Sequence, residues 1–388
     1  MFYWQRIFWV MLMMPLQSVA QKVMGVVKDQ DGKAMAGVSV FINTTSIGTS
    51  TDKNGMFMIG MPGSNAELIF TFSGYINKQI QISKDQIDKP LEIVMLQDVR
   101  MLDPVIVRSA MKDGWEKWGK FFVENFIGVT AEAANCKIEN PKALRFYFNQ
   151  QKNELTIAAS EPLIIQNNGL GYRIQFSLEE FVYSGRTHIT SYSGYPFFIE
   201  MNGSERKKRK WSDARQNVFK GSVMHFMRAL YRNELDKENF LVQPTKVEYN
   251  LEKKRVRAIY RNGNRVKDSS AYYSHILSQP DSFYVAGSAV KAESIAFAAN
   301  ETTGGISFEG PYQITYKGKK AEPEIATFMN DPQKVCSSFI RIINTDAIYI
   351  FEDGSQFPGN NLLTERYWAY TEKICRLLPF NYKIPRNK

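Results

Sequence analysis

Residues that commonly carry chemistry are few in this chain. It has three histidines, His188, His225 and His275, and none of them begins the His-x-x-Glu or His-Glu-x-x-His spacing with which peptidases bind zinc. The serine-hydrolase pattern Gly-x-Ser-x-Gly is not matched either, because residues 305–310 place the final glycine one position too late. We therefore predict no catalytic residue, no metal site and no cofactor, and we reject a zinc carboxypeptidase.

His225 is the histidine that we retain as a candidate site residue, together with Arg228 three positions later on a predicted helix. Paired with Cys136 or with a carboxylate, His225 could act as the base of an enzyme that hydrolyses cell-envelope polymer. A helix histidine that is hydrogen-bonded to a neighbouring strand explains the same residue equally well. A single sequence does not show which groups lie close together, so both interpretations stay open.

The chain has three cysteines, Cys136, Cys336 and Cys375. In an oxidising compartment they allow one disulfide and one remaining thiol, although spacing alone does not define the pairing. We favour a bridge between Cys336 and Cys375, because both lie in the C-terminal part.

The formal net charge of +10 predicts attraction to acidic surfaces such as phosphorylated lipopolysaccharide. Nucleic acid is a poor partner for an exported protein. The charge is spread along the chain except for one block of five successive cations: Arg206, Lys207, Lys208, Arg209 and Lys210. We interpret this block as a solvated loop, and a site for anionic lipid or lipopolysaccharide is the alternative.

The first 20 residues have the composition of a secretory signal peptide. One positive charge, Arg6, precedes an apolar run from Ile7 to Leu16, and Ser18-Val19-Ala20 forms a small-x-small cleavage site. The apolar run is shorter than the ~20 residues that a membrane helix needs. We expect a protein of the periplasm, or one associated with the outer membrane, with peripheral membrane contact at most.

Residues 21–98 consist of short strand-like runs separated by turns. Asp31-Gly32, Asn54-Gly55 and Pro62-Gly63 are typical turn sequences, and each lies between apolar runs of four to eight residues. About seven such runs follow one another without a helical period. This pattern predicts a seven-stranded β-sandwich.

The same residues carry a family resemblance. The strings that carry it include Gly25-Val26-Val27, Ala36-Gly37-Val38-Ser39-Val40, Asn54-Gly55-Met56-Phe57 and Phe72-Ser73-Gly74-Tyr75. They resemble the carboxypeptidase-regulatory-like, or transthyretin-like, domain of exported Bacteroidetes proteins. The resemblance implies a prealbumin-like β-sandwich that is an accessory module without catalytic residues.

In that family the domain often precedes the plug and barrel of a TonB-dependent transporter. About 280 residues follow Val107, which is far less than a 22-stranded barrel requires. We therefore do not expect a transporter.

Residues 99–109 are predicted to be a linker and residues 110–388 a larger β-rich α+β domain. Helices are expected near residues 110–127, 212–235 and 363–378. The first has an aromatic stripe that we interpret as core packing. The second is amphipathic and basic, and we expect it to pack on the β-domain rather than on a membrane surface. The fold class of the whole chain is then mainly β.

Strings in this second part, among them Leu170-Gly171-Tyr172 and Leu377-Leu378-Pro379, resemble a group of exported Bacteroidetes proteins that join such a sandwich to a similar region. The resemblance implies a shared architecture and transfers no activity. The leading hypothesis is a non-enzymatic binding or scaffold protein of the cell envelope whose partner is an envelope protein or a glycan. The sequence leaves its ligand and its oligomeric state open.

Overall fold

A computed structural model describes residues 21–63, 65–83, 87, 89–98, 110–261 and 270–385. The predicted signal peptide and the predicted linker at residues 99–109 lie outside the described residues. The chain divides into two compact units, one formed by residues 1–109 with 160–162 and 195–198, the other by the rest. Strands make up 41% and helices 24%, so the fold is α+β, with more helix than a mainly β chain would have.

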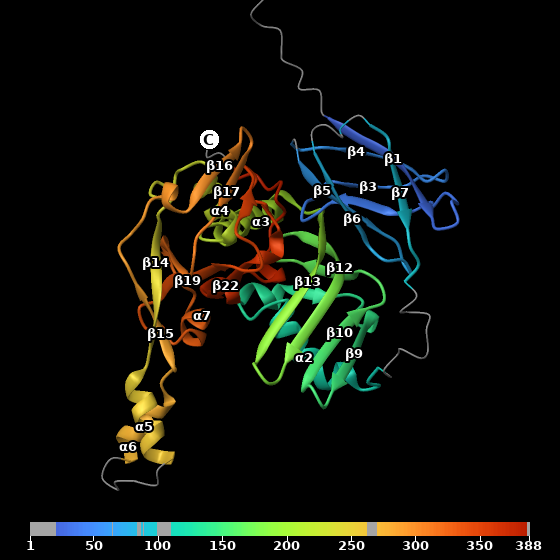
Figure 1. The fold of residues 1–388 in the computed structure, drawn as a ribbon. Coiled ribbons are helices and arrows are strands. Elements are labelled where there is room, and N and C mark those ends of the chain that lie inside the picture. Colours follow the sequence, from blue (N-terminus) through green and yellow to red (C-terminus); the bar gives the residue numbers. More distant parts are fainter. Residues whose placement is uncertain are drawn as a thin grey trace, which may run out of the picture. The chain divides into compact units, whose positions relative to one another are not determined.

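The described residues of the first unit form seven strands in two sheets (Figure 1). One sheet has the strand order β4 (Met56–Gly60), β1 (Lys22–Asp29), β7 (Leu91–Met95). The other has the order β3 (Gly48–Ser50), β2 (Ser39–Ile42), β5 (Ala66–Thr71), β6 (Lys78–Ile82). Alternate side chains of both sheets form one buried core, which includes Val23, Val40, Leu68, Phe70 and Ile93. The structure therefore has the number of strands that the turn spacing predicts.

Acidic residues define the hairpin turns of this unit. The Asp29 carboxylate accepts the backbone N–H groups of Asp31 and Lys33, and Asp52 accepts those of Asn54 and Met56. Such bonds occupy backbone donors that have no partner in a strand ladder. The sequence signals for these turns are local, which is why they could be recognised without the fold.

The second unit begins with a helix and a six-stranded sheet. Its elements are α2 (Gly114–Phe126), the 3₁₀ helices η4 (Ala131–Asn135) and η5 (Pro141–Ala143), and β8 (Cys136–Ile138), β9 (Leu144–Asn149), β10 (Glu154–Ala159), β11 (Leu163–Asn167), β12 (Tyr172–Ser184) and β13 (Ile189–Glu200). Phe122 and Phe126 of α2 are buried against Phe181 and Phe176 of β12, with ring centroids 5.0 and 4.9 Å apart. The aromatic stripe is thus core packing.

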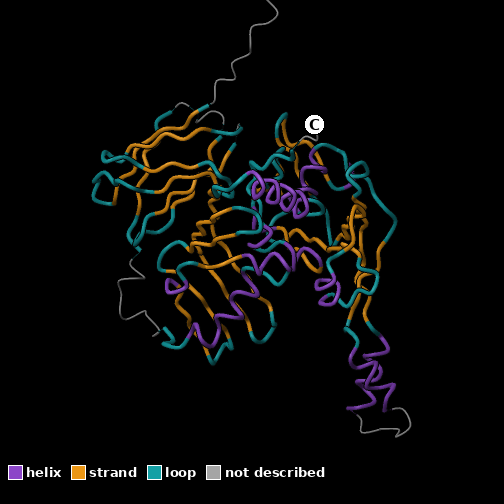
Figure 2. Tube along the Cα trace, turned by 180° about the vertical axis from the view of Figure 1, so that it is seen from behind, coloured by secondary structure: helices purple, strands orange, loops and turns teal. Residues whose placement is uncertain are grey.

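Two further sheets complete the second unit (Figure 2). One has the strand order β15 (Ser282–Ala286), β14 (Phe240–Tyr249), β18 (Tyr312–Lys320), β19 (Val335–Ile342), β22 (Leu362–Arg366), and the other β16 (Ala296–Asn300), β17 (Thr303–Ile306), β20 (Ile348–Ile350), β21 (Gln356–Phe357). Between the strands lie η7 (Ala292–Ser294), α7 (Pro323–Phe328) and η8 (Gly359–Asn361). One buried cluster, which includes Phe226, Ile306, Ile314, Ile340 and Trp368, joins both sheets.

The helix predicted at residues 212–235 is two helices, α3 (Glu205–Phe219) and α4 (Val223–Tyr231). The chain turns between them at Gly221, whose φ of 79° is strained for any side chain. Ser222 then caps α4 by accepting the N–H of His225. Because α3 already begins after the N-cap Ser204, the five basic residues are helical, and the prediction of a loop there was wrong.

The helix predicted at residues 363–378 is mostly absent. The chain instead forms β22, the short helix α8 (Tyr367–Thr371) and the 3₁₀ helix η9 (Ile374–Arg376). Residues 362–366 pair with β19, and Arg366 then has a φ of 63°. Pairing with a strand that is distant in the sequence overrides the local helical pattern here.

The hairpin of β14 and β15 carries two further helices, α5 (Leu251–Arg261) and α6 (Ser270–Ser278). Figures 1 and 2 show them at the end of this two-stranded ribbon, away from the sheets of the second unit. Val256, Tyr273 and Ile276 form a small core of their own between the helices.

All three cysteines are free thiols, and the favoured bridge between Cys336 and Cys375 is therefore wrong. Cys336 lies on β19 with its Sγ 3.5 Å from the carbonyl of Lys319. Cys375 lies on η9, and its Sγ is 3.5 Å from the hydroxyl of Thr130. Cys336 and Cys375 contact different polar groups. Both lie in the C-terminal part of the sequence, but this does not place their thiols next to each other.

Candidate functional site

His225, the candidate base, uses both of its ring nitrogens within the fold. Its Nδ1 accepts the N–H of Gly221 at 3.1 Å, so the proton sits on Nε2, which lies 3.0 Å from the Glu238 carboxylate. The side chain is 7% exposed. Burial lowers the pKa of His225 although Glu238 opposes the shift. A neutral imidazole with no free nitrogen cannot accept a proton from a substrate.

Arg228 is bonded entirely to backbone carbonyls. Its Nε donates to the carbonyl of Asp353 at 2.8 Å, and Nη2 donates to those of Phe380 and Tyr382 at 2.9 and 3.0 Å. The guanidinium also lies over the ring of Phe219, 5.3 Å from its centroid. Arg228 therefore fastens the C-terminal segment to α4 and has little capacity left for a ligand.

Cys136, the candidate nucleophile, lies on strand β8 and donates its Sγ–H toward the carbonyl of Glu132, 3.7 Å away. Burial raises the pKa of the Cys136 thiol, so that it stays protonated. The thiolate is the reactive form of cysteine, and the surroundings of Cys136 disfavour it. The hydrolase hypothesis thus lacks both its nucleophile and its base.

The five basic residues occupy the first two turns of α3, and all five are exposed. Only Lys208 has an ion pair in the described part of the chain, with Glu205 at 3.0 Å. The helix is held from its other face, where Trp211 donates to the carbonyl of Asn168 at 2.8 Å. Cations near the N-terminus of a helix interact unfavourably with the helix dipole. These five residues therefore destabilise α3, and their exposed side chains are accessible to anions.

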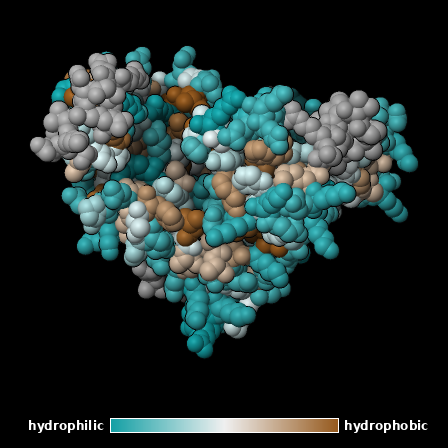
Figure 3. All heavy atoms as spheres, turned by 90° about the horizontal axis from the view of Figure 1, so that it is seen from below, coloured by the Kyte–Doolittle hydropathy of each residue, from teal (hydrophilic) through white to brown (hydrophobic). Residues whose placement is uncertain are grey.

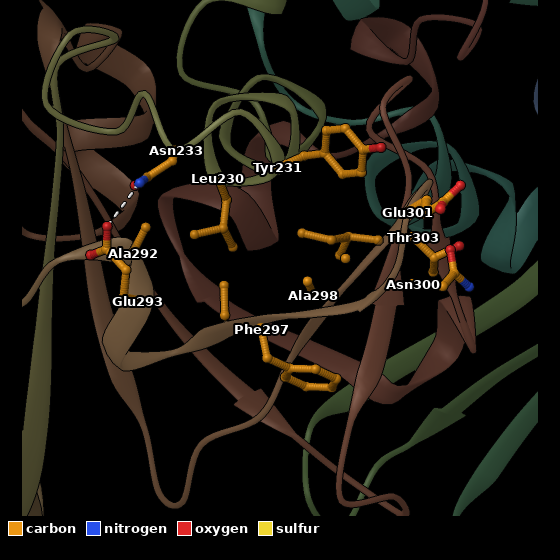
Figure 4. Close-up of a pocket in the computed structure, with 13 residues that line it drawn as sticks. Leu230, Tyr231, Asn233, Ala292, Glu293, Phe297, Ala298, Asn300, Glu301 and Thr303 are labelled. Carbon is orange, nitrogen blue, oxygen red and sulfur yellow. Dashed lines mark hydrogen bonds between the residues drawn. The ribbon is translucent and has the colours of Figure 1, made fainter.

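A hollow lies at the end of α4, where the sequence analysis predicted no site (Figure 4). It has a volume of about 490 Å³, which is in the range of small-molecule sites. Helix α4 contributes Leu230 and Tyr231, the hairpin of β16 and β17 contributes most of the opposite wall, and Ile350 comes from β20. We call this hollow the α4 pocket.

Apolar side chains form the floor of the α4 pocket. The floor consists of Leu230, Ala296, Ala298 and Ile350, and the two alanines leave room that larger side chains would fill. Gly304 contributes as well, because a Cβ there would come within 3.0 Å of the Ile350 side chain. The floor therefore offers apolar contact to a ligand without a specific charge.

Polar groups lie on two sides of the floor (Figure 4). On one side Asn233 donates its amide to Glu293 at 2.8 Å. A backbone N–H and the Asn233 amide hold the pKa of Glu293 below its ordinary value. On the other side lie Asn300, Glu301 and Thr303. Asn233 is placed by the end of α4, where its φ of 55° suits asparagine.

The lining of the α4 pocket carries few ionisable groups. No lysine, arginine, histidine or cysteine lines the α4 pocket, and the described residues contain no cluster of three or more metal-binding side chains. The two carboxylates and two amides are suited to accept and donate hydrogen bonds to a neutral ligand.

Comparison with known proteins concerns the first unit. Its seven strands and turns lie within residues 23–107 apart from the first residue of β1, and this range matches the family model of the CarboxypepD_reg-like domain. The chain contains a CarboxypepD_reg-like domain. Over 82 residues it is also 28% identical to TonB-dependent receptor P3 of Formosa agariphila, a match that covers 21% of this chain and 8% of that receptor.

Two solved structures illustrate how weakly known folds resemble this chain. A cohesin and X-dockerin complex from Acetivibrio cellulolyticus is 23% identical, and the match covers 20% of this chain and 58% of that one with a TM-score of 0.18. A DUF3823 family protein from Bacteroides ovatus is 11% identical, covering 47% and 82% of the two chains with a TM-score of 0.17. Scores this low carry no argument about function.

The CarboxypepD_reg-like domain matches the resemblance seen in the sequence. The α4 pocket lies outside residues 23–107, so the domain brings no information about its ligand. Among the described residues, no helix is both long and apolar enough to cross a membrane.

Proposed function

We propose that this protein is a non-enzymatic binding protein of the bacterial cell envelope, and that the α4 pocket holds a neutral glycan. The observation that carries the proposal is the lining of the pocket, which combines an apolar floor with carboxylate and amide groups on two sides and includes no cation. Both ring nitrogens of His225 are engaged within the fold, so His225 is not available as a base, and this supports binding over hydrolysis.

A neutral sugar fits this lining for simple chemical reasons. A pyranose ring has an apolar C–H face, which can lie on Leu230 and the alanines of the floor, and hydroxyl groups at its edge. Carboxylates such as Glu293 and Glu301 accept hydrogen bonds from hydroxyls, and the amide nitrogen of Asn300 can donate, since its oxygen already accepts from Thr302. An anionic ligand would be repelled by the two carboxylates.

The place in the envelope is supported by separate observations. The first 20 residues have the composition of a signal peptide, and the CarboxypepD_reg-like domain is similar to part of a TonB-dependent receptor. Both favour the periplasm or association with the outer membrane. An envelope protein is the alternative partner.

The proposal can be tested by calorimetric titration with neutral and phosphorylated oligosaccharides from the cell envelope. We expect a neutral oligosaccharide to bind with an affinity that changes less than about twofold between ~0.05 and ~0.5 M salt, because no charge pair forms. The sugars should be recovered uncleaved. Binding only of phosphorylated sugars, or release of cleaved product, would contradict the proposal.

A further inference from the structure

The ribbon of β14 and β15 with its two helices forms a projecting arm, which we define as residues 245–261 and 270–286. The ribbon pairs from Thr245 with Ala286 to Tyr249 with Ser282. A two-stranded ribbon buries little by itself and is only marginally stable alone. The arm extends away from the sheets of the second unit.

Ion pairs hold the base of the helical hairpin together. Asp281 lies 3.2 Å from the ammonium of Lys253 and 2.8 Å from the guanidinium of Arg257. Glu252 pairs with Arg255 and also accepts the hydroxyl of Tyr272 at 2.7 Å. Two of the acidic residues of the arm are therefore neutralised internally.

The charge of the arm is positive. Residues 245–261 and 270–286 contain six lysines and arginines and three aspartates and glutamates, a difference of +3. The ion pairs of Asp281 and Glu252 engage three of these cations and two of these acids, so a difference of +2 remains outside the pairs. Such a surface attracts polyanions or anionic lipid.

Large apolar and aromatic side chains are exposed beside these cations. Tyr249 and Leu251, at the junction of ribbon and helix, are each 73% exposed. Four more large side chains of the arm are exposed: Val247, Tyr272, Phe283 and Val285. Figure 3 shows hydrophobic residues in several patches among hydrophilic ones on the face drawn there, and exposed large apolar side chains also occur outside the arm. Exposed apolar residues gathered on one projecting element indicate a contact surface.

We propose that the arm docks on an anionic lipid surface, with Tyr249 and Leu251 entering the interfacial layer and the basic residues contacting lipid phosphates. Tyrosine has an apolar body and a polar tip and suits this layer, and lysine and arginine reach its phosphates. This is a peripheral contact in addition to the glycan site.

The arm suits this role better than the basic patch of α3. Stable membrane attachment takes two signals, apolar insertion and charge. The patch of α3 has only charge, since Trp211, the aromatic residue next to it, is buried. The arm has both signals within one element.

The test is sedimentation of the full chain with vesicles of phosphatidylcholine alone or with about one third phosphatidylglycerol, a fraction that gives a clearly negative surface. The proposal predicts binding to the anionic vesicles only, with weakening at ~0.5 M salt. The double variant Tyr249→Ser with Leu251→Ser should bind at least about tenfold more weakly, since two apolar side chains lose their burial.

Two controls decide the outcome. Ile189→Ser removes an exposed apolar residue of β13 that is 64% exposed and should leave binding unchanged. Replacement of residues 206–210 by glutamine removes the patch of α3 and should weaken binding less than the arm variant does. The proposal is overturned by loss of binding in the α3 variant with retention in the arm variant, by equal binding to neutral vesicles, or by no vesicle binding. Melting curves check that each variant is folded.

Discussion

Replacing Arg376 with methionine is expected to lower the free energy of unfolding by about 3–5 kcal/mol. The guanidinium is 4% exposed and lies 2.8 Å from a Glu322 oxygen and 3.3 Å from a Glu132 oxygen. Although burial alone would raise the pKa of Glu322, Arg376 and Lys319 hold it below its ordinary value. Without Arg376, two carboxylates would remain partly buried with much less compensation, which is why the cost is large.

Urea unfolding of Arg376→Met measures this cost. The matched control is Arg173→Met, because Arg173 forms a single, exposed ion pair with Glu139 at 2.7 Å and should cost about 1 kcal/mol or less. Adding Glu132→Gln and Glu322→Gln to Arg376→Met should recover part of the stability, since the stranded charges are removed. Equal costs for Arg376→Met and Arg173→Met would show that the buried cluster does not stabilise the unit.

Replacing Arg228 with methionine is expected to cost about 2–4 kcal/mol, because it leaves three backbone carbonyls without their donor. The C-terminal segment that contains Phe380 and Tyr382 should also become accessible to protease. Thermal melting and limited proteolysis measure the two effects.

Arg232→Met is the matched control on the next turn of the chain. Arg232 forms only a 3.6 Å ion pair with Glu352, and both side chains are about half exposed or more. It should change stability by less than about 1 kcal/mol. If Arg228→Met left stability unchanged, Arg228 would not fasten the C-terminal segment and would be free to serve a ligand.

The first unit could be predicted from the sequence because its signals are local. Asp29 and Asp52 each bond to the residues that follow them, so the turn and its sequence coincide. The aromatic period was likewise sufficient to predict a helix near residues 110–127, where the structure has α2 at 114–126. In both cases neighbours in the sequence determine the conformation.

Elements that depend on distant partners could not be predicted. Residues 362–366 form a strand because β19 is available to pair with them, and α5 and α6 lie where no helix was predicted. The start of α3 did have a local signal, Ser204 as N-cap, which the run of basic residues obscured.

The candidate sites likewise combine features that local sequence shows with contacts that depend on distant residues. His225 and Arg228 were recognisable as polar residues on an apolar helix, but their bonds to Glu238, Asp353 and the C-terminal segment are tertiary. The α4 pocket joins residues of α4 to a hairpin some 60 positions later, as the bond from Asn233 to Glu293 illustrates. No spacing in the sequence indicates that these two segments lie next to each other.

The central claim is that the α4 pocket holds the glycan, and one pair of variants tests it most directly. Ala298 and its neighbour Ala299 are both exposed, but only Ala298 lines the pocket. Calorimetric titration with a neutral oligosaccharide that binds the unaltered protein should show at least about a hundredfold loss of affinity for Ala298→Trp, because the indole fills the cavity, and nearly none for Ala299→Trp. Equal affinity of the two variants would contradict the assignment of the pocket.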